Sequence, residues 1–187
     1  KDHKVKLFFD ASDAIGVTHE GNNIAQLGEL SIFSLDEYSL LNATEGGCVT
    51  TNCDELAARL RNIRSSYVAG KPVSIPLTGN GRMSEAQAAF ALLRLDKYEE
   101  NNSHNQQLFN YYQQALADIP GVEFLASEAN SLHNYAHAII KIKQLGFGLN
   151  LEQLSRSLRA ENIECRSQLI GDHAPYNKIS NYTDILT

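Results

Sequence analysis

The stretch that decides the fold lies at residues 28–51, GELSIFSLDEYSLLNATEGGCVTT. It holds two short apolar segments, LSIFS at 30–34 and GGCVTT at 46–51, each bounded by glycine or polar residues. Short apolar runs with such boundaries are typical of β-strands. The polar segment between them therefore predicts a loop that joins two strands.

The flanking segments indicate alternating strands and helices. Upstream, VKLFFDAS at 5–12 predicts a strand with Asp10 at its carboxyl end. Downstream, residues 52–64 predict a helix with Asn52 as its cap and an inward face formed by Leu56, Leu60 and Ile63. Strands that alternate with helices predict α/β architecture.

The middle of the chain predicts a loop followed by a long helical region. The loop, residues 69–83, is rich in glycine and proline. A helix is expected from Ser84, with Gln87 completing a capping box and with Ala88, Leu92, Leu95 and Tyr98 on its inward face. It resumes through 106–119 and stops at Pro120-Gly121, with a kink or break expected at 101–105.

The last part of the chain predicts a compact α+β lobe. Strands are expected at 122–125, 135–142 and 163–169. Between the last two, residues 150–163 predict a helix capped by Asn150 and Gln153, with Leu151, Leu154 and Leu158 facing inward. We therefore expect three regions: 1–80 in a large α/β domain, 81–119 as a linking helix region, and 120–187 as a small domain.

Composition narrows the possible partners. Acidic residues outnumber basic ones by 22 to 16, and without a basic stripe this balance argues against nucleic acid. No apolar run approaches the roughly 20 residues of a membrane helix, and the start is no secretory signal.

The three cysteines match no metal spacing and predict free thiols in a reducing cytoplasm. His133 and His137, four apart in a strand-like run without a glutamate, are not expected to bind metal.

Ordered motifs add a resemblance to a known family. The chain resembles the second half of pyridoxal-phosphate (PLP) enzymes with the aspartate-aminotransferase fold, and more narrowly the DegT-type sugar aminotransferases. These act on keto sugars attached to nucleotides. The chain also begins almost inside a strand pattern, which indicates a preceding segment. The motifs are FDASD (9–13), AQLGELSIFSL (25–35), EGG (45–47), TGNGRMSEAQAAFALLRLD (78–96) and NIECRSQLIGDHAP (162–175).

The resemblance implies cofactor-binding roles at four positions. Asp10 takes the place of the carboxylate beside the pyridinium nitrogen, where an opposite charge keeps the ring protonated. Asp13 takes the position near the ring oxygen, and Ser34 that of a serine on the cofactor phosphate. Asn80 matches an asparagine that reaches the phosphate across a dimer interface. From the residues alone, the alternative is that Asp10 and Ser34 are ordinary strand-end residues and that Gly79-Asn80-Gly81 is simply a turn.

The resemblance also implies that the catalytic lysine is missing. Counting back from Glu45 places the Schiff-base lysine at Ser39, and no lysine occurs between Lys6 and Lys71. A hydroxyl forms no imine and is no base at neutral pH. Asp13, Asp36 and Glu37 add negative charge, which disfavours an anionic cofactor. In the terminal motif, Arg166 and His173 take substrate-binding positions, whereas a tyrosine expected after Arg166 is Leu169.

Three functional hypotheses remain open at this point. The first is a degenerate homologue of nucleotide-sugar aminotransferases of polysaccharide biosynthesis that does not transaminate. The second is an enzyme that uses PLP or its amine form, PMP, for a dehydratase-like reaction on a nucleotide-linked keto sugar. The third is an active aminotransferase whose lysine comes from another segment or chain. A homodimer, or pairing with an N-terminal half, is the expected assembly.

Overall fold

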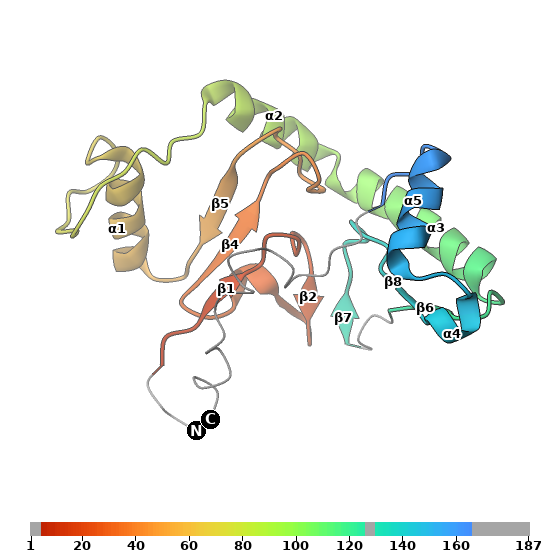
Figure 1. Ribbon diagram of the computed structural model, residues 1–187. Coiled ribbons are helices and arrows are strands. Elements are labelled where there is room, and N and C mark those ends of the chain that lie inside the picture. Colours follow the sequence, from red (N-terminus) through yellow and green to blue (C-terminus); the bar gives the residue numbers. More distant parts are fainter. Residues whose placement is uncertain (1–4, 126–129, 166–187) are drawn as a thin grey trace. The chain divides into compact units, whose positions relative to one another are not determined.

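The computed structural model describes residues 5–125 and 130–165 (Figure 1). The chain forms two compact units. The first comprises Lys1–Ala115 and Ala126–Ala138, and the second comprises Leu116–Leu125 and Ile139–Thr187. The chain thus leaves the first unit, enters the second, returns for a short segment and leaves again. The expected division into a large-domain part at 1–80, a linking helix region at 81–119 and a small domain at 120–187 stays a prediction.

A three-stranded sheet forms the centre of the first unit. Its order is β1 (Phe8–Asp10), β4 (Leu30–Ser34) and β5 (Gly47–Thr50). β1 runs parallel to β4, with Phe8 opposite Leu30, and β5 runs antiparallel to β4. All three strands were predicted, and their order brings together parts of the chain that residues 11–29 and 35–46 separate.

Burial alternates along β4, as a strand with one covered face requires. Ser31 is fully buried, and its hydroxyl donates to the carbonyl oxygens of Ile24 and Leu27 at 2.9 and 3.2 Å. Phe33, on the same face, is 4% exposed. The core beside it consists of Ala11, Ile15, Phe33, Leu35 and Ala43. The loops that follow β1 and β4 therefore supply most of the buried apolar residues.

A small second sheet lies after β1 and was not predicted. It joins β3 (Asn22–Asn23), β2 (Thr18–His19) and β7 (Ser131–Leu132), and η1 (Ile24–Gln26) follows it. The hairpin turn places Glu20 and Gly21 at φ 50° and 78°, the two positive values that a type I′ turn needs. Strands this short carry no apolar periodicity, so the sequence has no signal for them.

Helix α1 (Asp54–Ser65) forms where predicted, but its cap and buried face differ. Its N-cap is Cys53, which makes no side-chain capping bond, so the prediction of Asn52 was wrong. Asn62 is fully buried, whereas Ile63 is 37% exposed. The reason is the following loop: Asn62 Nδ2 donates to the carbonyl oxygen of Lys71 at 2.8 Å and thus holds the loop against that face.

The long helical region consists of α2 (Glu85–Asp96) and α3 (Tyr98–Leu116), with only Lys97 between them. The capping box of Ser84 and Gln87 is confirmed. The break predicted at 101–105 was wrong, because those residues lie within α3. The predicted inward face was also partly wrong: Leu92 and Leu95 are 64% and 52% exposed.

In its described residues, the second unit carries a two-stranded antiparallel sheet and the helices α4 and α5. β6 (Val122–Phe124) pairs with β8 (Ile140–Ile142), and α4 (Gln144–Phe147) and α5 (Leu151–Ala160) follow. The capping box of Asn150 and Gln153 is confirmed, but Leu151 is 45% exposed while Ser155 is buried. The predicted strand at 135–142 is confined to 140–142, and residues 163–165 form no strand. The rest of that last prediction lies outside the described residues.

Two further features concern the helices and the cysteine thiols of the described residues. No helix in 5–125 or 130–165 has both the length and the apolar character needed to cross a membrane. The thiols of Cys48, Cys53 and Cys165 are free, and burial raises the pKa of Cys48.

Candidate functional site

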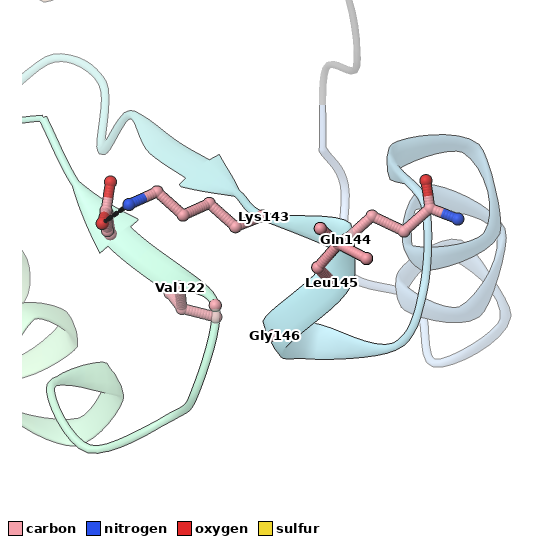
Figure 2. A pocket seen from close by; sticks show the side chains of 7 residues that line it. Val122, Lys143, Gln144, Leu145 and Gly146 are labelled. Atoms are coloured by element: carbon pink, nitrogen blue, oxygen red, sulfur yellow. Dashed lines mark hydrogen bonds and ion pairs between the residues drawn. The ribbon is translucent and has the colours of Figure 1, made fainter.

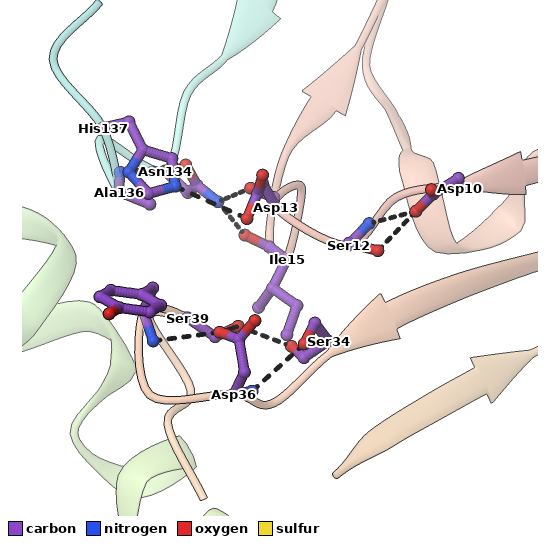
Figure 3. A network of polar contacts seen from close by, with 11 residues as sticks. Asp10, Ser12, Asp13, Ile15, Ser34, Asp36, Ser39, Asn134, Ala136 and His137 are labelled. Atoms are coloured by element: carbon purple, nitrogen blue, oxygen red, sulfur yellow. Dashed lines mark hydrogen bonds and ion pairs between the residues drawn. The ribbon is translucent and has the colours of Figure 1, made fainter. Parts of the chain in front are cut away.

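The candidate site forms where β1 and β4 end side by side (Figure 3). These strands are parallel, and Asp10 lies opposite Ile32, so Ser34 stands just beyond Asp10 at the same edge. The amide of Ser34 donates to the carbonyl oxygen of Ser12 at 3.3 Å, which ties the two loops together. The carboxyl edge of parallel strands is where α/β folds bind ligands. The fold thus places Asp10 and Ser34 at one edge of the sheet, and their cofactor-binding roles stay predictions.

Asp10 has a local partner in this structure. Its carboxylate accepts hydrogen bonds from both the amide and the hydroxyl of Ser12. This is an Asx turn, in which an aspartate stabilises the backbone after a strand. Asp10 nevertheless remains exposed to solvent, so its carboxylate is accessible to a ligand.

A tight polar turn links Ser34 to Ser39 (Figure 3). The hydroxyl of Ser39, a residue only 9% exposed, donates to the carbonyl oxygen of Ser34 at 2.9 Å and lies 3.1 Å from Asp36 Oδ1. The Tyr38 amide also donates to Asp36 Oδ1, at 3.0 Å, and the Asp36 amide donates to Ser34 Oγ at 3.2 Å. Both serines that the sequence singled out are therefore engaged within one turn.

Asp36 carries the negative charge of this turn. Burial alone would raise the pKa of Asp36, but hydrogen bonds from Tyr38, Ser39 and Ser34 outweigh it and lower the pKa below its usual value. The carboxylate is therefore ionised at neutral pH. Position 39 accordingly presents a hydroxyl bound to an anion.

The third part of the site comes from the distant segment 130–138. Asn134, 3% exposed, donates through Nδ2 to the carbonyl oxygens of Asp13 and Ile15 at 2.8 and 3.0 Å. Its Oδ1 accepts from the Ala136 amide at 3.2 Å. His137 Nε2 lies 3.5 Å from Asp13 Oδ1. Sequence reasoning missed Asn134, because nothing in a strand-like run identifies which polar side chain will be buried.

His133, which precedes Asn134 in the same segment, has a lowered pKa. Burial lowers the pKa of His133, and the neighbouring His137 lowers it further. The Nδ1 atom of His133 lies 2.9 Å from the Tyr135 amide, for which it serves as acceptor. Tyr135 has a positive φ of 50°, and residues 135–139 lie outside any strand, unlike the predicted strand at 135–142.

The remaining predicted positions are not part of this network. Asn80 lies in the loop between α1 and α2, where its Oδ1 accepts from Arg82 Nε at 3.1 Å. Its expected contact across a dimer interface stays a prediction. Arg166 and His173 lie outside the described residues.

The second unit has its own cavity, of about 550 Å³, shown in Figure 2. Its two charged side chains pair with each other: Lys143 forms an ion pair with Glu123 that lowers the pKa of that carboxyl. Gly121, Val122, Gln144, Leu145 and Gly146 complete the lining.

The residues at the carboxyl edge fit part of what PLP needs. Asp10 and Ser34 suit non-covalent contacts with a ring nitrogen and a phosphate. The covalent anchor does not fit, because no residue from 7 to 70 is a lysine and the Ser39 hydroxyl is bound to Ser34 and Asp36. Within the described residues, no three His, Cys, Asp or Glu side chains gather to hold a metal ion.

Comparison with known families and curated proteins gives consistent matches. The model of the DegT/DnrJ/EryC1/StrS aminotransferase family matches residues 1–184. The dTDP-4-amino-4,6-dideoxy-D-glucose transaminase of Shigella dysenteriae is 25% identical, over 98% of this chain and 50% of that protein. GDP-perosamine synthase of Caulobacter vibrioides is 32% identical, over 63% of this chain and 32% of that protein.

Solved structures agree. DesI, crystallised in the presence of its TDP-sugar product, is 31% identical with a TM-score of 0.83, over 94% of this chain and 46% of that one. PseC of Helicobacter pylori, an aminotransferase involved in pseudoaminic acid biosynthesis, is 22% identical with a TM-score of 0.80, over 96% and 50%. This chain spans about half the length of the relatives it matches. These likenesses confirm the predicted α/β fold of PLP-dependent aminotransferases over that half.

Proposed function

This chain belongs to the DegT/DnrJ/EryC1/StrS aminotransferase family, and on that premise we propose that it acts in nucleotide-sugar metabolism without transferring amino groups itself. It is a homologue of nucleotide-sugar aminotransferases. In this proposal residues 1–80 are the second part of the large domain, and position 39 is that of the lost Schiff-base lysine. The ligand is a nucleotide-linked keto sugar of cell-surface polysaccharide synthesis.

One observation supports the proposal that this chain does not transfer amino groups. The Ser39 hydroxyl donates to the carbonyl oxygen of Ser34 and contacts the Asp36 carboxylate. A primary amine in this turn would hold the cofactor and move a proton, and neither task is open to a hydroxyl engaged in this way. Loss of one member of a cooperating catalytic set costs several orders of magnitude in rate.

The names of the relatives support a nucleotide-linked sugar as the class of ligand. The Shigella protein is a transaminase for a dTDP-linked amino sugar, the Caulobacter protein makes a GDP-linked one, and DesI was crystallised with a TDP-sugar. We propose that Arg166 and His173 contact this ligand, and that Asn80 completes the site of a second protomer. Pairing as a homodimer, or with an N-terminal half, follows from the same proposal.

A second candidate function rests on Asp10. Its carboxylate is exposed at the carboxyl edge, next to Ser34, where both could make the non-covalent contacts of a PLP or PMP ring. In that case the chain binds PMP without a covalent link and modifies a nucleotide-linked keto sugar by a dehydratase-like reaction. When bound, the cofactor would supply an electron sink. Asp10 would keep its ring nitrogen protonated.

The two candidates separate in one set of titrations. The full-length protein is titrated with PLP and, separately, with PMP, while absorbance is followed. It is then incubated with glutamate and a dTDP- or GDP-linked 4-keto sugar. The proposal expects no amino sugar, no cofactor linked to the chain after borohydride reduction, and no turnover with PMP. Saturable PMP binding with loss of the keto sugar supports the second candidate.

A matched pair of variants makes the test specific. Ser39→Lys restores an amine and is expected to gain a borohydride-stable cofactor adduct at residue 39, seen by peptide mass spectrometry. Ser39→Ala, which also breaks the turn's hydrogen bonds, is expected to gain none. Amino transfer to the keto sugar by the unmodified protein would contradict the proposal.

A further inference from the structure

Charge is segregated along the first unit of the chain. Residues 56–84, which form α1 and the loop after it, hold five Lys or Arg and no Asp or Glu. Residues 7–55, in the same unit, hold nine Asp or Glu and no Lys or Arg. The five cations are all exposed, and we call them the basic surface: Arg59, Arg61, Arg64, Lys71 and Arg82.

The basic surface also carries exposed apolar side chains. Tyr67, Val68 and Leu77, in the loop after α1, are 45%, 79% and 77% exposed. Exposed apolar residues that gather among polar ones mark interaction sites. Protein interfaces are enriched in arginine and tyrosine and depleted in aspartate and glutamate. The composition of residues 56–84 therefore favours a docking surface over an ordinary solvated helix face.

The loop after α1 is held in place against the helix. The amides of Gly79 and Gly81 donate to the carbonyl oxygens of Ile63 and Arg64 at 2.8 and 3.0 Å. Nearer the start of the loop, Asn62 makes the hydrogen bond described above. The loop is thus anchored near both of its ends. A surface that is already ordered loses less conformational entropy on association.

The basic surface has no acidic partner in its own molecule. Within residues 5–125 and 130–165, none of its five cations forms an ion pair. Figure 1 shows α1 on one side of β4 and β5 and the turn after β4 on the other. That turn and the loop after β1 carry four carboxylates, which we call the acidic edge: Asp10, Asp13, Asp36 and Glu37. The cations of α1 therefore do not reach the acidic edge of their own molecule.

We propose that two copies of this chain associate, with the basic surface of each copy docked on the acidic edge of the other. A two-fold axis makes the two contacts equivalent and closes the pair. Opposite charges on the two surfaces attract at encounter and disfavour other registers. A nucleic acid is a poorer occupant of the basic surface, because the nine carboxylates of residues 7–55 repel phosphate groups.

This association goes beyond the homodimer proposed above, because it names both surfaces and requires neither cofactor nor sugar. Its failure would therefore leave the proposed lack of amino transfer untouched. Sedimentation velocity of the full-length protein measures the dimer dissociation constant. We expect a dimer at an ionic strength of about 0.01 M and a weaker one at about 0.1 M, because the screening length falls from about 30 to about 10 Å. A monomer at both, or a dissociation constant that ignores salt, would overturn the proposal.

Charge reversal on α1 locates the basic surface in the contact. The double variant Arg61→Glu, Arg64→Glu should raise the dissociation constant at least about tenfold, because attraction becomes repulsion. The matched control Arg156→Glu, Arg159→Glu makes the same change of net charge at exposed positions of α5 and should leave the dissociation constant unchanged. Equal effects of the two double variants would show a response to net charge alone and contradict the proposal.

A mixing experiment identifies the second copy as the occupant. Asp13→Lys, Glu37→Lys reverses the acidic edge and should also weaken the dimer when this variant is alone. Mixed with Arg61→Glu, Arg64→Glu, it should form a heterodimer, because every contact again joins opposite charges. Two folded variants, checked by circular dichroism, that fail to associate when mixed would overturn the proposal.

Single neutral variants keep the test valid should a double reversal not fold. Arg61→Gln and Glu37→Gln each remove one charge at an exposed position. Each should raise the dissociation constant by about two- to fivefold, the range of one exposed ion pair. Dissociation constants equal to that of the unmodified protein in both variants would exclude the two surfaces from the contact.

Discussion

The phenol of Tyr98, at the start of α3, occupies the space where a Cβ on Gly16 would lie. Such a Cβ would stand 1.7 Å from Tyr98 Oη. Gly16 has a φ of 74°, and Tyr98 Oη lies 3.4 Å from the carbonyl oxygen of Ile15, to which it donates. The glycine therefore lets α3 pack against the loop that carries Asp13 and Ile15.

Substitution of Gly16 tests this packing. Gly16→Ala should lower the free energy of unfolding by about 2–4 kcal/mol, because it adds left-handed strain and displaces Tyr98. The matched control is Gly21→Ala, where φ is 78° and nothing lies within 4 Å of the added Cβ. It should lose only about 1 kcal/mol. Urea denaturation measures both, and equal losses would mean that Tyr98 moves aside at no cost.

Loss of the Asn134 side chain should destabilise the candidate site. Asn134→Ala leaves the carbonyl oxygens of Asp13 and Ile15 and the Ala136 amide without this partner. We expect a loss of about 2–3 kcal/mol in unfolding free energy. Asn110→Ala, at an exposed position of α3, is the control and should change stability by less than about 0.5 kcal/mol. A loss below about 1 kcal/mol for Asn134→Ala is roughly the contribution of one ordinary hydrogen bond. It would argue against the view that the Asn134 side chain holds the loop with Asp13 and Ile15 in place.

The lowered pKa of Asp36 predicts that the folded protein loses stability in acid. Its pKa is lowered in the folded state from the ordinary value of 3.8, so the folded chain favours the ionised form. This contribution is fully present above pH 3.8 and is lost as the pH falls through the lower, folded pKa. Asp36→Asn should therefore be less stable than the unmodified protein at pH 7, with a gap that narrows on acidification.

Unfolding midpoints at pH 7, 4 and 3 measure this gap. Asp118→Asn, at an exposed position after α3, serves as the control. A gap for Asp36→Asn that stays constant across the series would show that the carboxylate is not stabilised by the turn.

The lowered pKa of His133 predicts a second loss of stability on acidification, at a higher pH than that of Asp36. Burial and His137 lower its folded pKa below 6.5, so the unfolded chain takes up a proton more readily. The stability that depends on neutral His133 is complete above pH 6.5 and is lost as the pH falls toward the folded pKa. Protonation also removes the acceptor for the Tyr135 amide.

Thermal melts between pH 8 and 5 check this expectation. His133→Gln should show a flatter pH profile than the unmodified protein. His19→Gln, on the exposed hairpin, should keep the original profile. A profile for His133→Gln as steep as that of the unmodified protein would assign the acid sensitivity to another group.

Local signals in the sequence predicted the elements of the fold well. The capping boxes at Ser84 and Asn150 formed as expected, because each joins residues only three apart. The strands at 8–10, 30–34 and 47–50 likewise follow short apolar runs. The family resemblance correctly predicted the fold, and the structure brings Asp10 and Ser34 to one edge.

The cap of α1, the inward face of α2 and the role of Asn134 were decided by tertiary structure. Leu92 and Leu95 recur at helical spacing, yet Ala91 is the residue of α2 that packs against the core, so spacing alone cannot say which side another segment will cover. Asn134 acquires its role from carbonyl groups 119 and 121 residues away. Amino-acid order determined the capping boxes, the strands of the central sheet and the family, because those signals lie in short stretches of the chain. Contacts between distant segments determined which polar groups were buried together, because burial depends on what the rest of the chain brings near.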